Sequence, residues 1–211
     1  MLRGRSLCGR DARPEVLRRI AEYCAFRAGA FQVTAKQDPE LEKMVRHNVR
    51  QEFDAELPKD FRLECDAPVV CDGRMLPHKW IETERGILKV DNATHGDDHF
   101  FPGPCDIAWD LAGTIVEWEL NEESRGFFID EYRSKAGHVA LKKVSRYLLA
   151  YAVFRMAYCK MAAASMSGTD EGARLVRDFS KYRGIAANLV RQVSEQDGRR
   201  PRVVEGILQS S

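Results

Sequence analysis

The 211-residue sequence contains 33 Lys and Arg against 32 Asp and Glu, and this balance gives no support for binding nucleic acid or an anionic membrane. Hydrophobic residues make up 44% and charged residues 31%, which is typical of a soluble globular protein. The length fits one large domain, or one domain with an appendage.

Two helices are predicted in the first quarter of the chain. Residues 13–31 carry apolar side chains at helical spacing, with Asp11 as a possible N-cap. Residues 38–57 repeat this pattern, and Asp38 followed by Pro39 suits a helix start.

The pattern then changes to short apolar runs bounded by turn residues. We predict small strands at 69–71, 79–81 and 87–90, with residues 82–86 as a hairpin turn. A polar loop, residues 72–78, joins the first strand to the second.

The remainder of the chain is predicted to be helical. Its helices are 104–120, 121–137, 138–165 and 170–196, and the third is nearly apolar all round in its middle, which is typical of a buried helix. The fold class is therefore mainly α (α+β), a helical bundle with a β insert at about residues 67–91.

Compartment signals are consistent with a cytoplasmic protein. The N-terminus lacks an apolar stretch long enough for a signal peptide, and the most apolar run carries Arg155 and Lys160, so we expect no membrane span. The six cysteines are scattered without a CxxC pair and are expected to be reduced thiols.

The stretch from 89 to 113 is rich in acidic and histidine side chains. It is compatible with a metal site, an acid/base cluster or a solvated loop, and it contains Asp91, His95, Asp97, Asp98, His99, Asp106 and Asp110. Together with Asp72 and His78, Asp91 follows a strand-and-hairpin pattern that would bring three side chains to one sheet edge. Carboxylates in such a position suit Mg²⁺, although strand ends are commonly polar without any function.

Two segments carry a family resemblance: "VVCDGRMLPHKWIETERGILKVDN" and "PCDIAWDLAG". They resemble the C-terminal lobe of the aminoglycoside-phosphotransferase and choline-kinase branch of the protein-kinase-like fold, over roughly residues 14–165. Asp72 matches the catalytic Asp, His78 lies near the metal-binding Asn position, and Asp91 matches the metal-binding Asp. Asp110 begins the Asp-Leu-Ala motif of the following helix.

The resemblance implies a domain at 14–195 between an N-terminal extension (1–13) and a tail (196–211). It implies Mg²⁺ and ATP as cofactors and phosphoryl transfer to a small-molecule hydroxyl, with Asp72 as the catalytic base and with Asp91 and His78 on the metal.

Two further assignments leave alternatives open. Asp110 is expected to be a buried structural carboxylate, or else a helix first-turn Asp favoured by the dipole. The substrate-binding candidates in the loop after Asp91 could instead brace that loop, bind a second metal or be merely solvated; they are His95, Asp97, Asp98 and His99.

The sequence also departs from the family pattern. Val70 stands where a His usually precedes the catalytic Asp, and His78 replaces an Asn with one extra loop residue. No Gly-rich strand or strand Lys precedes the first helix, so we expect a C-lobe alone that associates with itself or with a separate N-lobe. The alternatives to a phosphotransferase are a catalytically inactive binding or regulatory module and a metal-dependent hydrolase that uses the Asp/His cluster.

Overall fold

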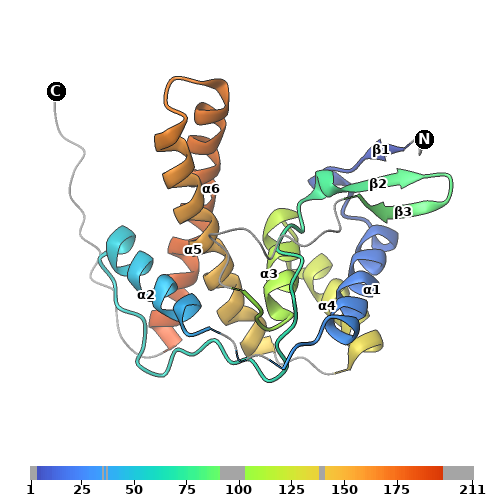
Figure 1. The fold of residues 1–211 in the computed structure, drawn as a ribbon, viewed down its shortest axis with the longest axis horizontal. Coiled ribbons are helices and arrows are strands. Elements are labelled where there is room, and N and C mark those ends of the chain that lie inside the picture. Colours follow the sequence, from blue (N-terminus) through green and yellow to red (C-terminus); the bar gives the residue numbers. More distant parts are fainter. Residues whose placement is uncertain (1–3, 35, 37, 91–102, 138–140, 197–211) are drawn as a thin grey trace. The chain divides into compact units, whose positions relative to one another are not determined.

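The structure is a computed structural model that describes residues 4–34, 36, 38–90, 103–137 and 141–196 (Figure 1). The described chain forms helices and three short strands, and it divides into two compact units. The first unit comprises Met1–Glu42 and Arg62–Tyr151, and the second comprises Lys43–Phe61 and Ala152–Ser211. No helix in the described ranges is both long enough and apolar enough to cross a membrane.

Three helices lie entirely within the first unit and contribute buried side chains to its core. They are α1 (Pro14–Ala30), α3 (Ala108–Glu117) and α4 (Glu122–Ala136), and α1 packs against α4. Pro at the first helical position fits α1 because its missing N–H would have no partner there.

The predicted N-cap of α1 is wrong. Arg13 occupies the cap position, and the Asp11 carboxylate instead accepts the backbone N–H of Cys8 at 2.9 Å and the guanidinium of Arg5 at 2.8 Å. The neighbouring cation and these hydrogen bonds hold the pKa of Asp11 well below its usual range, with the Arg5 bond as the largest cause.

A small antiparallel sheet lies in the same unit, in the order β1-β2-β3. Strands β2 (Trp80–Thr83) and β3 (Gly86–Lys89) form the predicted hairpin, close to the expected positions. Strand β1 (Arg5–Ser6) pairs with β2 and was not predicted, because two residues are too few for a visible alternation. The predicted strand at 69–71 is reduced to isolated bridges of Val69 with Gln32 and Cys105.

Helix α3 starts four residues later than the helix predicted from residue 104. The Asp106 carboxylate accepts the backbone N–H of Ala108 at 3.0 Å. The first N–H groups of a helix have no partner within the helix, and this hydrogen bond satisfies one of them. The other Asp106 oxygen accepts Lys143 Nζ at 3.0 Å. Three tryptophans, Trp80, Trp109 and Trp118, are among the largest fully buried side chains of this unit.

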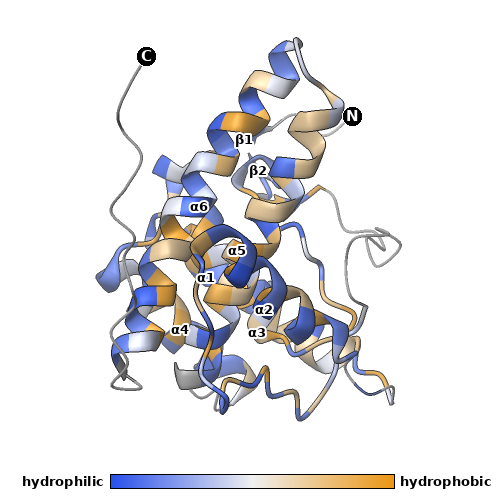
Figure 2. Cartoon of the chain, turned by 90° about the vertical axis from the view of Figure 1, so that its left-hand side faces the viewer, coloured by the Kyte–Doolittle hydropathy of each residue, from blue (hydrophilic) through white to orange (hydrophobic). Residues whose placement is uncertain are grey.

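Helices make up most of the described residues of the second unit. It contains most of α2 (Glu40–Phe53), the second half of α5 (Leu141–Ser165) and α6 (Asp170–Gln196). Residues 147–153 of α5 are buried on all faces, as a helix that is apolar all round should be. Along α6, by contrast, hydrophobic and hydrophilic residues alternate (Figure 2), and Leu175, Tyr182 and Val190 are buried. The prediction of a mainly helical chain with a small β hairpin is confirmed.

Candidate active site

The loop that carries Asp72 is tied down on both sides by main-chain hydrogen bonds within the first unit. Val69 exchanges two such bonds with Cys105, at 2.9 and 3.2 Å, just ahead of α3. Val70 donates its N–H to the carbonyl of Phe31 at 3.0 Å, immediately after α1. The loop therefore enters the site between the end of α1 and the start of α3.

Asp72 is a buried carboxylate with three donors. Its Oδ1 accepts Lys89 Nζ at 3.1 Å and the backbone N–H of Arg74 at 3.1 Å, while Oδ2 accepts the Tyr23 hydroxyl in a short hydrogen bond. The side chains of Asp72 and Lys89 are only 1% and 4% exposed, so the pair is shielded from water. Burial and the Asp72 carboxylate raise the pKa of Tyr23, so this hydroxyl keeps its proton and acts as a donor.

Asp110 forms hydrogen bonds with the backbone of the same loop. From the first turn of α3 its fully buried carboxylate accepts the N–H of Asp72 at 2.8 Å and the N–H of Gly73 at 2.9 Å. Burial, together with the negative charge of Asp72, raises the pKa of Asp110 to about 6, although both hydrogen bonds act in the opposite direction. A first-turn Asp stabilised only by the helix dipole would have a lowered pKa. The geometry therefore favours a structural carboxylate that shapes the loop.

Arg27 supports the network from α1. Its guanidinium donates to the Tyr23 hydroxyl at 3.3 Å and to the carbonyl of Val70, and it lies over the Phe31 ring at 4.3 Å from the centroid. With 4% exposure it is a buried cation beside two buried carboxylates, Asp72 and Asp110. Its position partly balances their charge.

Of the predicted metal-binding and substrate-binding residues, only His78 lies within the described residues. His78 lies on a short 3-10 helix, Pro77–Lys79, and is exposed, whereas Asp72 is buried. Asp91, His95, Asp97, Asp98 and His99 lie outside the described residues. Within the part of the chain that is described, no three His, Cys, Asp or Glu side chains gather in a way that could hold a metal ion.

Three residues of the network were missed by sequence reasoning: Tyr23, Arg27 and Lys89. A weak signal existed for two of them. Arg27 interrupts the apolar run at the end of α1, and Lys89 lies two residues before Asp91 in the sequence. Tyr23 sits in the apolar stripe of α1 and gave no sign of a polar role.

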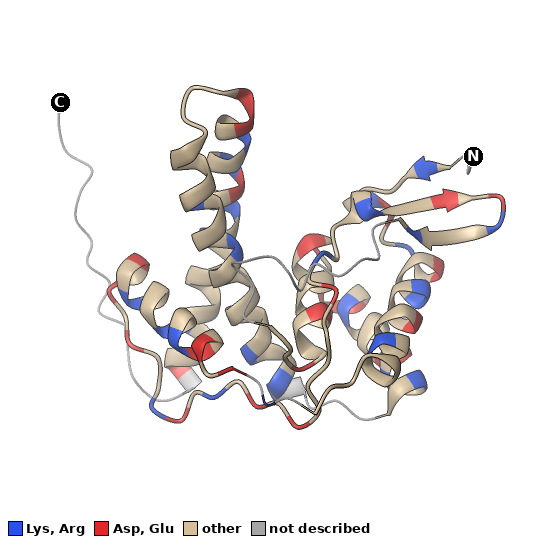
Figure 3. Ribbon diagram, in the orientation of Figure 1, with Lys and Arg blue, Asp and Glu red and all other residues tan. Residues whose placement is uncertain are grey.

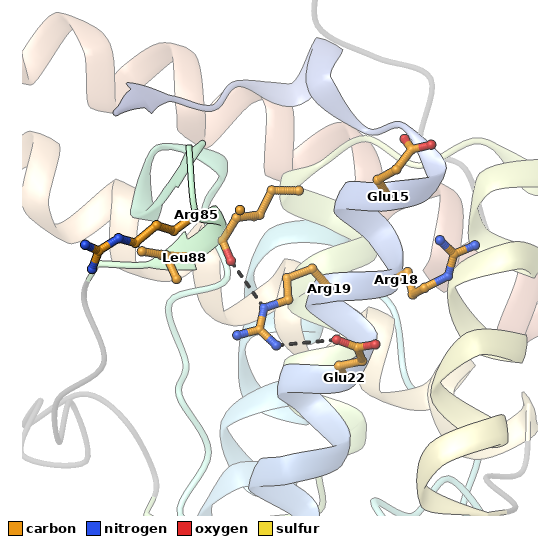
Figure 4. A pocket seen from close by; sticks show the side chains of 8 residues that line it. Glu15, Arg18, Arg19, Glu22, Arg85 and Leu88 are labelled. Carbon is orange, nitrogen blue, oxygen red and sulfur yellow. Dashed lines mark hydrogen bonds and ion pairs between the residues drawn. The ribbon is translucent and has the colours of Figure 1, made fainter. Parts of the chain in front are cut away.

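A separate open pocket of about 330 Å³ lies between α1 and the hairpin (Figure 4). Basic and acidic residues are intermixed along α1 and the hairpin (Figure 3). Arg19 links the two elements, because its Nε donates to the carbonyl of Ile87 at 3.2 Å. The pocket is lined by Glu15, Arg18, Arg19, Glu22, Arg85, Gly86, Ile87 and Leu88. None of the Asp72 network lines this pocket, so it is distinct from the candidate active site.

Neither a protein-family model nor a curated protein sequence matches the chain. Solved structures do resemble it. A structure of LicA in complex with AMP matches with a TM-score of 0.61 at 17% identity, over 90% of this chain and 68% of that one. A choline/ethanolamine kinase family protein from Mesorhizobium loti matches with a TM-score of 0.59 at 14% identity, over 91% of this chain and 70% of that one.

An ethanolamine kinase from Plasmodium vivax also matches, with a TM-score of 0.57 at 12% identity, over 86% of this chain and 63% of that one. The chain thus has the protein-kinase-like fold of choline and ethanolamine kinases, as predicted, and it spans about two thirds of the length of these structures. Within that fold its described helices and small antiparallel sheet correspond to a kinase-like C-lobe.

Proposed function

We propose that this protein transfers a phosphoryl group from ATP, with Mg²⁺, to the hydroxyl of a small molecule. The observation that carries the proposal is the Asp72 loop, whose carboxylate is held in one orientation and whose backbone is gripped by Asp110. Phosphoryl transfer depends mostly on positioning and electrostatics, and such a loop supplies the first of these. The fold shared with choline and ethanolamine kinases supports the same class of reaction.

In this proposal Asp72 orients the acceptor hydroxyl and takes its proton. A carboxylate has about four lone-pair positions, and the three donors around Asp72 leave about one for a substrate. The acceptor would have to approach along that direction.

Asp91 and His78 would hold the metal. The fit rests mainly on Asp91, because His78 is an exposed imidazole, which suits Mg²⁺ less well than oxygen does. When bound, Mg²⁺ with ATP supplies the phosphoryl group and the charge that neutralises its oxygens. The substrate-binding candidates of the following loop, His95, Asp97, Asp98 and His99, remain a proposal for the acceptor side.

Replacing Asp72 by Asn tests the proposal directly. With ATP, Mg²⁺ and a panel of small alcohols that begins with choline and ethanolamine, we expect kcat to fall about 100-fold or more, because a general base contributes roughly 10²–10⁴. The measurement is phosphorylated product by mass spectrometry, together with ADP release.

Asp130→Asn, a change at a largely exposed carboxylate of the same unit, is the matched control and should keep full activity. Full activity in Asp72→Asn would contradict the role of Asp72. Absence of any product from the wild-type protein across the panel would contradict the proposed reaction.

A second candidate function is a non-catalytic module that binds ligands with the same fold. The engagement of Asp72 by Lys89 and Tyr23 favours it, because the carboxylate has almost no exposed surface. The third possibility, a metal-dependent hydrolase, depends on Asp and His side chains that lie outside the described residues and stays a prediction.

Thermal unfolding with and without Mg²⁺-ATP separates binding from turnover. If the site binds nucleotide, a concentration 100 times the dissociation constant stabilises the protein by about 2.7 kcal/mol. For a chain of this size this corresponds to a rise in Tm of roughly 5–11 °C. We expect this shift in the wild type and its loss in Asp91→Ala; a shift without product formation would favour the non-catalytic module. Equal shifts in both proteins would exclude Asp91 as a ligand of the metal.

A further inference from the structure

Lys89 ends strand β3 in an unusually shielded position. It pairs with Trp80 across the hairpin, and its side chain is 4% exposed. The ammonium lies 3.1 Å from Asp72 Oδ1 and 5.9 Å from the centroids of both the Tyr23 and the Trp80 rings. Among the described residues, the Asp72 carboxylate and the Tyr23 and Trp80 rings therefore lie close to this cation.

Burying a lysine side chain at this position is unfavourable, because its charge loses contact with water. Taking an ammonium out of water costs several kcal/mol unless a well-placed anion compensates for it. An apolar side chain would suit a short half-buried strand better. The cation is compensated here by Asp72, so its placement makes physical sense as part of the Asp72 site rather than as part of the sheet.

The contacts around Asp72 show what Lys89 does to the carboxylate. Lys89 and the backbone N–H of Arg74 both hold Oδ1, while the Tyr23 hydroxyl holds Oδ2. Donors on both oxygens fix the rotation of the carboxylate plane. Removal of Lys89 would leave Oδ1 with the Arg74 N–H and a buried negative charge without its ammonium partner.

We propose that Lys89 is a positioning residue for Asp72: it holds the carboxylate in the orientation in which its one remaining lone pair faces the acceptor hydroxyl. Because this inference rests on the proposed phosphoryl transfer, Lys89 acts on the turnover step through Asp72. Binding of the nucleotide phosphates by Lys89 is the alternative, and the kinetics below distinguish the two roles.

The main test compares kcat and KM for Lys89→Met and Lys89→Arg, with Lys135→Met as a control at an exposed lysine of the same unit. We expect Lys89→Met to lower kcat about 100-fold, the size of effect that misplacement of a reacting group by an ångström can produce. The KM for ATP should stay within about threefold, since ground-state binding is untouched. Lys89→Arg should recover part of kcat, because it restores the cation.

Chemical rescue strengthens the comparison. Added methylammonium should raise kcat of Lys89→Ala and leave the wild type and Lys135→Met unchanged, because a small cation can enter the space that the side chain vacates. If Lys89→Met raised the KM for ATP and left kcat unchanged, the inference would be overturned and Lys89 would be assigned to phosphate binding instead. Unchanged kinetics in Lys89→Met would overturn it as well.

An unfolding experiment keeps this inference separate from the proposed function. Urea midpoints are measured for Lys89→Met, Asp72→Asn and the double variant, which also shows whether each protein folds. If the two groups hold each other, the double variant should be no less stable than the worse single variant. Midpoint shifts that add up would overturn the positioning role, whether or not the wild type transfers phosphate. Additivity is expected instead when Asp72→Asn is combined with Lys135→Met.

Discussion

Replacing Asp110 by Ala is expected to lower the free energy of unfolding by about 3 kcal/mol. The carboxylate is fully buried and accepts the N–H groups of Asp72 and Gly73 at 2.8 and 2.9 Å. Alanine would leave one buried and one partly buried N–H without this acceptor, and an unpaired buried donor costs about 1–3 kcal/mol. For a chain of this length the loss corresponds to a fall in Tm of roughly 6–12 °C, measurable by circular dichroism.

Asp110→Asn serves as the matched variant. The amide keeps one oxygen for one N–H but turns its own NH₂ towards the other, so we expect a loss of similar sign and somewhat smaller size, about 2 kcal/mol. Asp130→Ala, on an exposed surface of α4, should change stability by less than about 0.5 kcal/mol. An Asp110→Ala protein as stable as the Asp130→Ala protein would refute the view that this carboxylate supports the loop.

Trp118→Ala is expected to be the most destabilising single change considered, at about 4 kcal/mol, because truncation of a buried Trp removes apolar contacts and leaves a cavity. Trp118 is 1% exposed at the end of α3, and its indole N–H donates to the carbonyl of Met75 at 2.8 Å. The side chain therefore both fills the core of the first unit and holds the far end of the Asp72 loop.

Trp118→Phe separates the two contributions. Phenylalanine retains much of the apolar volume but has no donor for the Met75 carbonyl, so a loss of about 1–2 kcal/mol is expected, mostly from the unmade hydrogen bond. Urea unfolding followed at several wavelengths measures both variants. If Phe proved as costly as Ala, the hydrogen bond would outweigh the packing, contrary to this expectation.

The helices and the hairpin could be predicted from the sequence because their periods are strong local signals. The buried stretch of α5 and the hairpin of β2 and β3 were both visible as patterns. Boundaries were less accurate where a side chain intervened, as at α3, where Asp106 binds the N–H of Ala108. The fold itself was predicted from a resemblance over two segments rather than from any single spacing.

The internal partners of Asp72 could not be predicted in the same way. Tyr23, Arg27 and Lys89 come from α1 and β3, far from Asp72 in sequence, and only the packing of the first unit brings them to it. A lysine at the end of a four-residue strand would ordinarily be assigned to the solvent face. Its burial follows from the pairing partner, which periodicity does not reveal.

The loop around Asp72 is held almost entirely through its main chain. Asp110 binds two of its N–H groups, and Trp118 binds the carbonyl of Met75. Every residue carries a main-chain carbonyl, and every residue except proline carries a main-chain N–H, so these three hydrogen bonds use groups that do not distinguish one side chain from another. The fold thus divides two tasks: helix α3 and its C-terminal Trp118 set the main-chain geometry of the loop, while Tyr23 and Lys89, from α1 and β3, orient the Asp72 carboxylate.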